Sequence, residues 1–238
     1  MAEKYYGFSV YNYCINNPLR FVDPDGRDLK ISEPSHDKAI EQLQAKVGSS
    51  IKLLRDEKTG VVTYTTTNTN KKLKGLAKRL AGVIDDNKVT VNVTTTDKDE
   101  TSKGRLLVGG AFMGNEVEKD KDGNVTHITA YQEVNPNFLE DIENITGKPG
   151  ELMMHEVTEA YEGAQISAEN GYSSLNADSQ SSVYEKAHKR ATPQPEMETY
   201  LFNAKGNKVY SYDAGAVKMD IYVYAKGKFK FFKTIKLK

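Results

Sequence analysis

Hydrophobic and polar positions along this chain follow two periods, and each period predicts one kind of secondary structure. Apolar residues three or four positions apart are typical of a helix, as at Leu73, Leu76 and Leu80. β-Branched runs and alternation of apolar with polar residues are typical of strands. Helices are predicted for residues 37–47, 73–84, 137–145, 151–164 and 183–191. Strands are predicted for residues 61–67, 89–96, 105–108 and 125–133, and again from Tyr200 onward, with connecting segments at 31–35 and 165–182.

The last segment, residues 226–238, alternates most regularly. One side carries Phe229, Phe231, Ile235 and Leu237, and the other carries Lys228, Lys230, Lys236 and Lys238. Lysines protect exposed strands from edge-to-edge association, so this pattern predicts a terminal strand with a lysine face. Together the segments predict an α+β fold: a small mixed or antiparallel sheet, several helices and a β-rich C-terminus.

Composition narrows the classes of protein that remain. The 238 residues can form one good-sized domain with a sizeable core. Lys+Arg and Asp+Glu are both 33, and this zero net charge argues against a dedicated nucleic-acid binder, so no nucleic-acid partner is expected. A single cysteine, Cys14, allows neither an internal disulfide framework nor a thiolate metal cluster. The absence of a long apolar run or an apolar leader favours a soluble domain with no membrane span.

The predicted helix 151–164 carries the most informative chemistry, in His155, Glu156 and Glu159. His155 and Glu159 are four residues apart, so both side chains project from one face of a helix. Such a pair can bind zinc while the intervening Glu156 acts as general base on a metal-bound water. The common motif has histidine where Glu159 stands; with a carboxylate there, zinc remains the expected ion and iron or manganese is less excluded. The alternative interpretation is a solvated acidic helix with one histidine.

A hydrolytic zinc site usually takes three protein ligands and a water, so a third ligand is needed. His188, on the next predicted helix, is the leading candidate, because two antiparallel helices joined by a loop can bring it to the ion. Glu162 and Glu185 are alternative carboxylate ligands. His127 lies in a β-branched stretch typical of a sheet, and His36 lies in a segment expected to be exposed.

The first 28 residues differ from the rest in being rich in Tyr, Asn, Pro and Gly. They follow the pattern Tyr-x-Tyr-x-x-Asn-Asn-Pro-x-x-x-x-Asp-Pro-x-Gly, filled by Tyr11, Tyr13, Asn16, Asn17, Pro18, Asp23, Pro24 and Gly26. This segment closely resembles the end of the Rhs repeat-associated core domain. Some members of that family cut themselves after this glycine using aspartates of the motif, and the corresponding acid here is Asp23. Arg27 follows Gly26, where the self-cleaving pattern has leucine.

The resemblance implies a division into residues 1–28, the end of an Rhs-type core, and residues 29–238, a C-terminal toxin domain. With the zinc motif, the expected function is a zinc-dependent peptidase toxin, secreted or delivered to the cell surface within a larger effector. The resemblance also implies three partners: a protein or peptide substrate, a cognate immunity protein and the Rhs shell of the parent chain. Two other functions stay open, a toxin nuclease and a non-catalytic binding or adhesion module. For a peptidase, strand 105–108 or 125–133 is expected to offer an open edge to an extended peptide.

Overall fold

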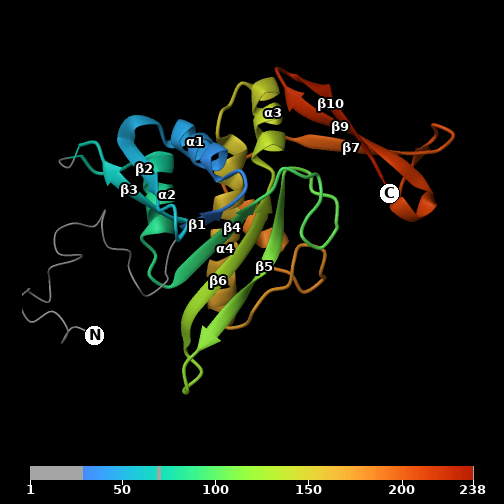
Figure 1. Ribbon diagram of the computed structural model, residues 1–238. Helices are drawn as coiled ribbons and strands as arrows, with labels where there is room; N and C mark the ends of the chain where they lie inside the picture. Colours follow the sequence, from blue (N-terminus) through green and yellow to red (C-terminus); the bar gives the residue numbers. More distant parts are fainter. Residues whose placement is uncertain (1–28, 69–70, 238) are drawn as a thin grey trace, which may run out of the picture.

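The computed structural model describes residues 29–68 and 71–237, and over these residues the chain has the α+β architecture expected from the sequence (Figure 1). Asp23 and the whole Rhs-like segment 1–28 lie outside the described residues. The helices are α1 (His36–Val47), α2 (Gly75–Ile84), α3 (Pro136–Thr146), α4 (Glu151–Asn170) and α5 (Tyr184–Arg190), with short 3₁₀ turns η3 (Gly48–Ser50) and η4 (Tyr212–Ala214). Within the described part, no helix is long and apolar enough to cross a membrane.

A mixed six-stranded sheet forms the larger part of the fold. Its strands are β1 (Leu29–Ser32), β2 (Ile51–Arg55), β3 (Val61–Thr66), β4 (Val89–Thr95), β5 (Gly110–Lys119) and β6 (Val125–Val134). Their order is β2-β3-β1-β4-β6-β5, with β1, β4 and β6 parallel and the other pairs antiparallel. The β-branched strands β4 and β6 lie inside the sheet, and β5 forms the edge nearest to α4.

Helix α4 is the centre of this part, since it contacts β4, β5 and β6 and also each of the other four helices described. Its first ten residues, 151–160, are all buried. An ordinary surface helix buries one stripe and exposes the opposite face. Here the flanking elements leave no exposed face in the first half, so any polar residue in that half must find a partner within the protein.

The second sheet is antiparallel and lies at the C-terminal end of the fold (Figure 1). Its strands are β7 (Met197–Asn203), β8 (Lys208–Val209), β9 (Ala216–Ala225) and β10 (Lys228–Lys236), in the order β10-β9-β7-β8. One face joins the common core through buried Met219, Ile221 and Val223. Phe232 also packs edge-to-face on Phe138 of α3, with ring centroids 5.0 Å apart. This confirms the β-rich C-terminus.

Several local expectations were wrong. The described structure places no strand at residues 105–108; Leu106 forms only an isolated bridge, and the strand starts at Gly110. Strand 125–133 exists as β6, but β4 and β5 flank it, so it has no open edge. Three strands, β1, β2 and β5, arise where none was predicted, and α4 runs six residues beyond residue 164.

The expected lysine face of the last strand is also interrupted. A β-bulge between Phe231 and Lys233 shifts the register of β10 against β9. An extra residue in a strand turns the following side chains to the opposite face. Phe231 is therefore 54% exposed, while Phe232 takes its place against the core.

Candidate metal centre

The start of α4 is fixed from outside the helix. The Glu143 carboxylate at the end of α3 accepts hydrogen bonds from the backbone N–H groups of Gly150 (2.7 Å) and Leu152 (2.9 Å). These N–H groups have no partner inside the helix, so an acceptor from α3 satisfies them. Gly150 also approaches α1 closely: a Cβ there would lie 1.9 Å from the carbonyl oxygen of Gln42. The helix that carries the motif therefore begins at a defined point.

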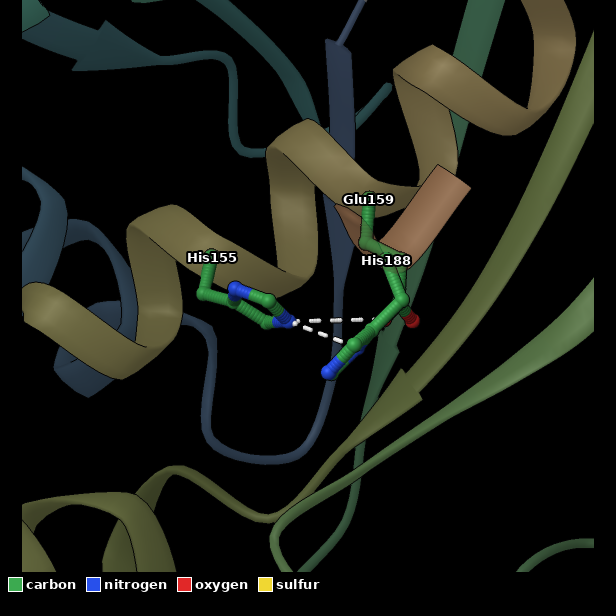
Figure 2. A group of neighbouring side chains, drawn as sticks. All are labelled: His155, Glu159 and His188. Carbon is green, nitrogen blue, oxygen red and sulfur yellow. Dashed lines mark hydrogen bonds and ion pairs between the residues drawn. The ribbon is translucent and has the colours of Figure 1, made fainter. Parts of the chain in front are cut away.

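His155, Glu159 and His188 come together as the sequence predicted (Figure 2). One ligand atom from each lies within 4.8 Å of the others. His188 Nδ1 is 2.6 Å from Glu159 Oε2 and 3.2 Å from His155 Nε2, and His155 Nε2 is 3.4 Å from Glu159 Oε2. Helix α4 supplies the first two residues one turn apart, and α5 packs on α4 so that His188 reaches them.

The donor set fits a zinc ion. Ligand atoms about 2.0–2.2 Å from a tetrahedral zinc lie about 3.3–3.6 Å from one another. Two of the three separations, 3.2 and 3.4 Å, are close to this range, and the third is a direct hydrogen bond between His188 and Glu159. His155 Nδ1 donates to the carbonyl oxygen of Thr192 at 2.5 Å. In the neutral ring this bond places the proton on Nδ1 and leaves Nε2 of His155 unprotonated and facing the cluster, which is the state a metal ligand needs.

Glu156 lies beside this cluster in a tight, buried place. Its carboxylate accepts a hydrogen bond from Nε2 of Gln132 on β6, and the same nitrogen is 3.4 Å from Oε1 of Glu159. It also lies directly over Gly110, where a Cβ would be 2.0 Å from Oε2 of Glu156. Burial, and secondarily the neighbouring Glu159, raise the pKa of Glu156 to about 8. A carboxyl with this pKa exchanges a proton near neutral pH.

The pKa values of the two helix residues of the cluster move in opposite directions. Burial opposes charge on His155, but the hydrogen bond to Glu159 and the nearby carboxylates outweigh it and raise the pKa of His155. Burial likewise favours the neutral form of Glu159, but hydrogen bonds from His155 and His188 outweigh it and lower the pKa of Glu159. Each shift favours the charged form of its own group where no metal is bound.

The remaining candidates lie apart from this cluster. Glu162 pairs with Arg79 at 3.1 Å, and His127 lies 3.1 Å from the hydroxyl of Thr90 within the sheet. Glu185 is exposed. His36 is 9% exposed and lies between two carboxylates, so the expectation of an exposed residue was wrong. Over the described residues, His155, Glu159 and His188 are the group of ligand-type side chains whose spacing suits a metal.

Sequence patterns did not identify Gln132, Thr192 or Gly110 as neighbours of the cluster and of Glu156. A glutamine in a predicted strand and a threonine after a helix carry no periodic signal. The pair Gly109-Gly110 indicated only a loose connection after the strand predicted at residues 105–108. In comparisons with protein-family models, curated proteins and solved structures, the chain shows no significant match.

Proposed function

We propose that residues 29–238 form a zinc-dependent peptidase, the toxin domain of an Rhs-type effector. The observation that carries the proposal is the cluster of His155, Glu159 and His188 with the buried carboxyl of Glu156 beside it. The Rhs assignment rests on the motif in residues 11–26. With it come delivery within a larger secreted or surface-displayed chain, a cognate immunity protein and a protein or peptide substrate.

In this proposal, His155, Glu159 and His188 hold the ion. When bound, zinc supplies Lewis-acid chemistry, which acidifies a water molecule and stabilises negative charge on a carbonyl oxygen. Glu156 takes up the proton of the attacking water on its carboxylate and returns it to the leaving amine. Gln132 holds that carboxylate in place through its amide N–H. Gly110 leaves the space that the carboxylate occupies.

The substrate approaches from the side of His188. The side chain of His188 is 34% exposed, whereas those of His155 and Glu159 are each 3% exposed. The outer edge of β5 is already paired with the chain itself: Ala177 N–H donates to Phe112 O at 3.1 Å, and Asn115 N–H donates to Ser174 O at 2.9 Å. A peptide that added to this edge would have to displace this segment, so docking over α5 is favoured.

Metal analysis of the purified protein tests the site. We expect one zinc per chain, lost in His155→Ala and Glu159→Gln and retained in Glu162→Gln, which changes a carboxylate of the same helix outside the cluster.

Glu156→Gln should keep the zinc and abolish both proteolysis and toxicity. Preparations that never hold metal would overturn the proposal. A toxic Glu156→Gln variant would remove the assigned base, and nucleic-acid degradation by the wild type would replace peptidase with nuclease.

A further inference from the structure

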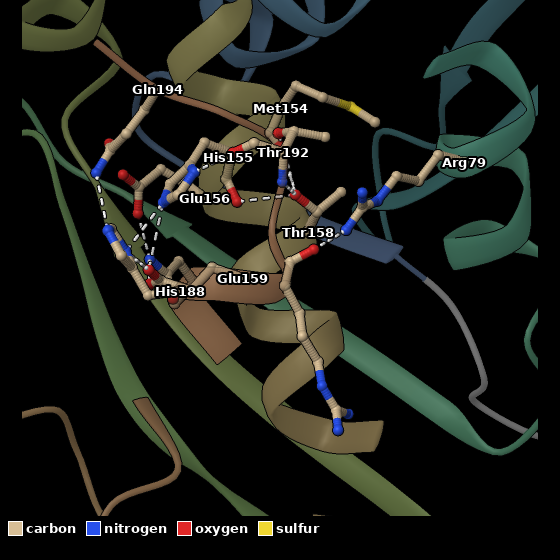
Figure 3. Close-up of polar contacts among 11 residues, drawn as sticks. Arg79, Met154, His155, Glu156, Thr158, Glu159, His188, Thr192 and Gln194 are labelled. Carbon is tan, nitrogen blue, oxygen red and sulfur yellow. Dashed lines mark hydrogen bonds and ion pairs between the residues drawn. The ribbon is translucent and has the colours of Figure 1, made fainter. Parts of the chain in front are cut away.

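The short segment that follows α5 touches both histidines of the cluster on the sides that face away from Glu159 (Figure 3). The carbonyl oxygen of Thr192 accepts from His155 Nδ1, and the side-chain nitrogen of Gln194 is 3.3 Å from His188 Nε2. The outer nitrogens of both imidazoles therefore contact one segment of three residues. Groups in this position decide which nitrogen of each ring is protonated.

Thr192 is held firmly to the helix that carries His155. It is 3% exposed; its backbone N–H donates to Oγ1 of Thr158 at 3.0 Å, and the two hydroxyl oxygens are 3.2 Å apart. Thr158 is anchored in turn by donating to the carbonyl oxygen of Met154 at 2.8 Å. A backbone carbonyl can only accept, so this network keeps a proton on Nδ1 of His155, and in the neutral ring the lone pair of Nε2 then faces the cluster.

The situation at His188 is reversed. Its Nδ1 faces the cluster and donates to Glu159 at 2.6 Å, so in the neutral ring Nε2 accepts from the amide of Gln194. A nitrogen that binds a metal has to be unprotonated. Binding through Nδ1 therefore requires the ring proton to lie on Nε2, which then needs an acceptor. A glutamine amide offers a donor and an acceptor on the two ends of one group and can present either by a half-turn.

We propose that Thr192 and Gln194 are positioning residues of the metal centre, and that the amide of Gln194 reverses when the metal binds. In the free centre the amide nitrogen donates to Nε2 of His188; in the loaded centre the amide oxygen accepts from Nε2–H. The proton leaves Nδ1 and reappears on Nε2 by exchange with water, which reaches the 34% exposed ring. This inference rests on the metal centre of the proposed function, but not on its peptidase activity.

Zinc affinity, measured by competition with a chromophoric chelator, tests the role of Gln194. Gln194→Met keeps the length and removes the acceptor, and we expect a loss of affinity of about 10–100-fold. Gln194→Glu supplies an acceptor only and should bind zinc at least as tightly as the wild type. The matched control is Gln180→Met, at an exposed glutamine of the preceding loop. Wild-type affinity in Gln194→Met would overturn the inference.

Nitrogen-15 NMR of the imidazoles gives a signature that a merely structural role would not produce. In the wild type, His188 should change from the Nδ1–H to the Nε2–H form on addition of zinc, while His155 keeps Nδ1–H throughout. In Gln194→Glu, Nε2 of His188 should already carry a proton without metal, while Nδ1 still donates to Glu159 until zinc is added. A His188 tautomer that stays the same with and without zinc would overturn the inference. A protein that shows these changes but cleaves no peptide would refute the proposed activity and leave the inference standing.

Two variants of Thr158 test the hydrogen-bond network that holds Thr192 against His155. Thr158→Val keeps the branched shape but removes the hydroxyl that binds Thr192, whereas Thr158→Ser retains it. Loss of zinc affinity in the first, with recovery in the second, supports the role of Thr192. Equal affinity in both variants and the wild type would contradict it.

Discussion

Helix α4 and the outer face of the C-terminal sheet depart from the usual pattern of burial in opposite directions. In α4, polar residues are inside: counted as whole residues, His155 and Glu159 are each 2% exposed and Glu156 is 7% exposed. In the sheet, large apolar residues are outside: Phe231 is 54% and Tyr224 is 43% exposed. Buried polar groups are the more informative departure, because each lowers stability unless it has a partner.

The two regions offset the free-energy cost of these buried polar and exposed apolar residues in different ways. In α4 each buried polar side chain of the cluster has specific hydrogen-bond partners from other elements, such as Gln132 and Thr192. In the sheet, aromatic rings meet across strands: Tyr222 and Phe231 lie edge-to-face at 5.6 Å, and Lys208 lies 3.6 Å above Tyr200. Hydrogen bonds are directional and hold side-chain atoms in one geometry, whereas contacts between rings stabilise the pairing of strands. This difference supports placing the proposed metal centre on α4.

The largest difference between the two regions should appear when one aromatic residue packed against α4 and one on the outer face of the C-terminal sheet are truncated. Phe112 on β5 is 1% exposed and packs against Gly163 of α4. Phe112→Ala should lower the free energy of unfolding by about 3–5 kcal/mol, from lost burial and the cavity left behind. Phe231→Ala should lower it by about 0.5–1.5 kcal/mol, the range for an aromatic pair. Chemical denaturation measures both, and equal losses would contradict the contrast.

The buried carboxyl of α4 should make the stability of the metal-free protein depend on pH. Because the pKa of Glu156 rises from its ordinary 4.5 to about 8 in the fold, the folded state holds a proton between these values that the unfolded state lacks. Stability should therefore fall as pH rises through this window, by on the order of a few kcal/mol. Glu156→Gln should flatten the curve, and Phe231→Ala should leave its shape unchanged. A wild-type curve without slope in this window would refute the buried neutral carboxyl.

Zinc should bind at α4 only in the folded protein, and this binding should stabilise the fold. At a free zinc concentration about 100 times the Kd, the free energy of unfolding should rise by about 2.7 kcal/mol. Glu159→Gln should abolish this gain, and Glu162→Gln, which alters the pair with Arg79, should retain it. Thermal unfolding with and without a chelator gives the measurement. A gain that survives Glu159→Gln would place the zinc elsewhere.

Two glycine substitutions test how tightly the site is packed. Gly110→Ala places a methyl group where the Glu156 carboxylate lies and should destabilise by about 1–3 kcal/mol. Gly82→Ala, in α2, meets no atom within 4 Å and should stabilise by about 0.5–1 kcal/mol, because alanine favours helix. Gain of stability in both variants would show that Glu156 does not occupy the space over Gly110.

The parts of the fold that the sequence predicted are those with a strong local period. The β-branched runs became β3, β4 and β6, and the spacing of Leu76 and Leu80 became α2. The missed strands lacked such a signal: β5 begins with glycine, and β1 is four residues long. Phe231 and Ile235 were predicted to share one side of the last strand, and this was wrong because a bulge, formed only when β10 pairs with β9, interrupts the alternation between them.

For the site, the local sequence was enough to predict which metal-binding side chains are available. The four-residue spacing puts His155 and Glu159 on one helix face, and this follows from the helical period alone. The burial of α4, the contact of His188 with Glu159 and the hydrogen bonds from Gln132 and to Thr192 all depend on how distant elements pack together. Those contacts join residues 24–37 positions apart, so packing between elements sets them, and local periodicity carries no information about it.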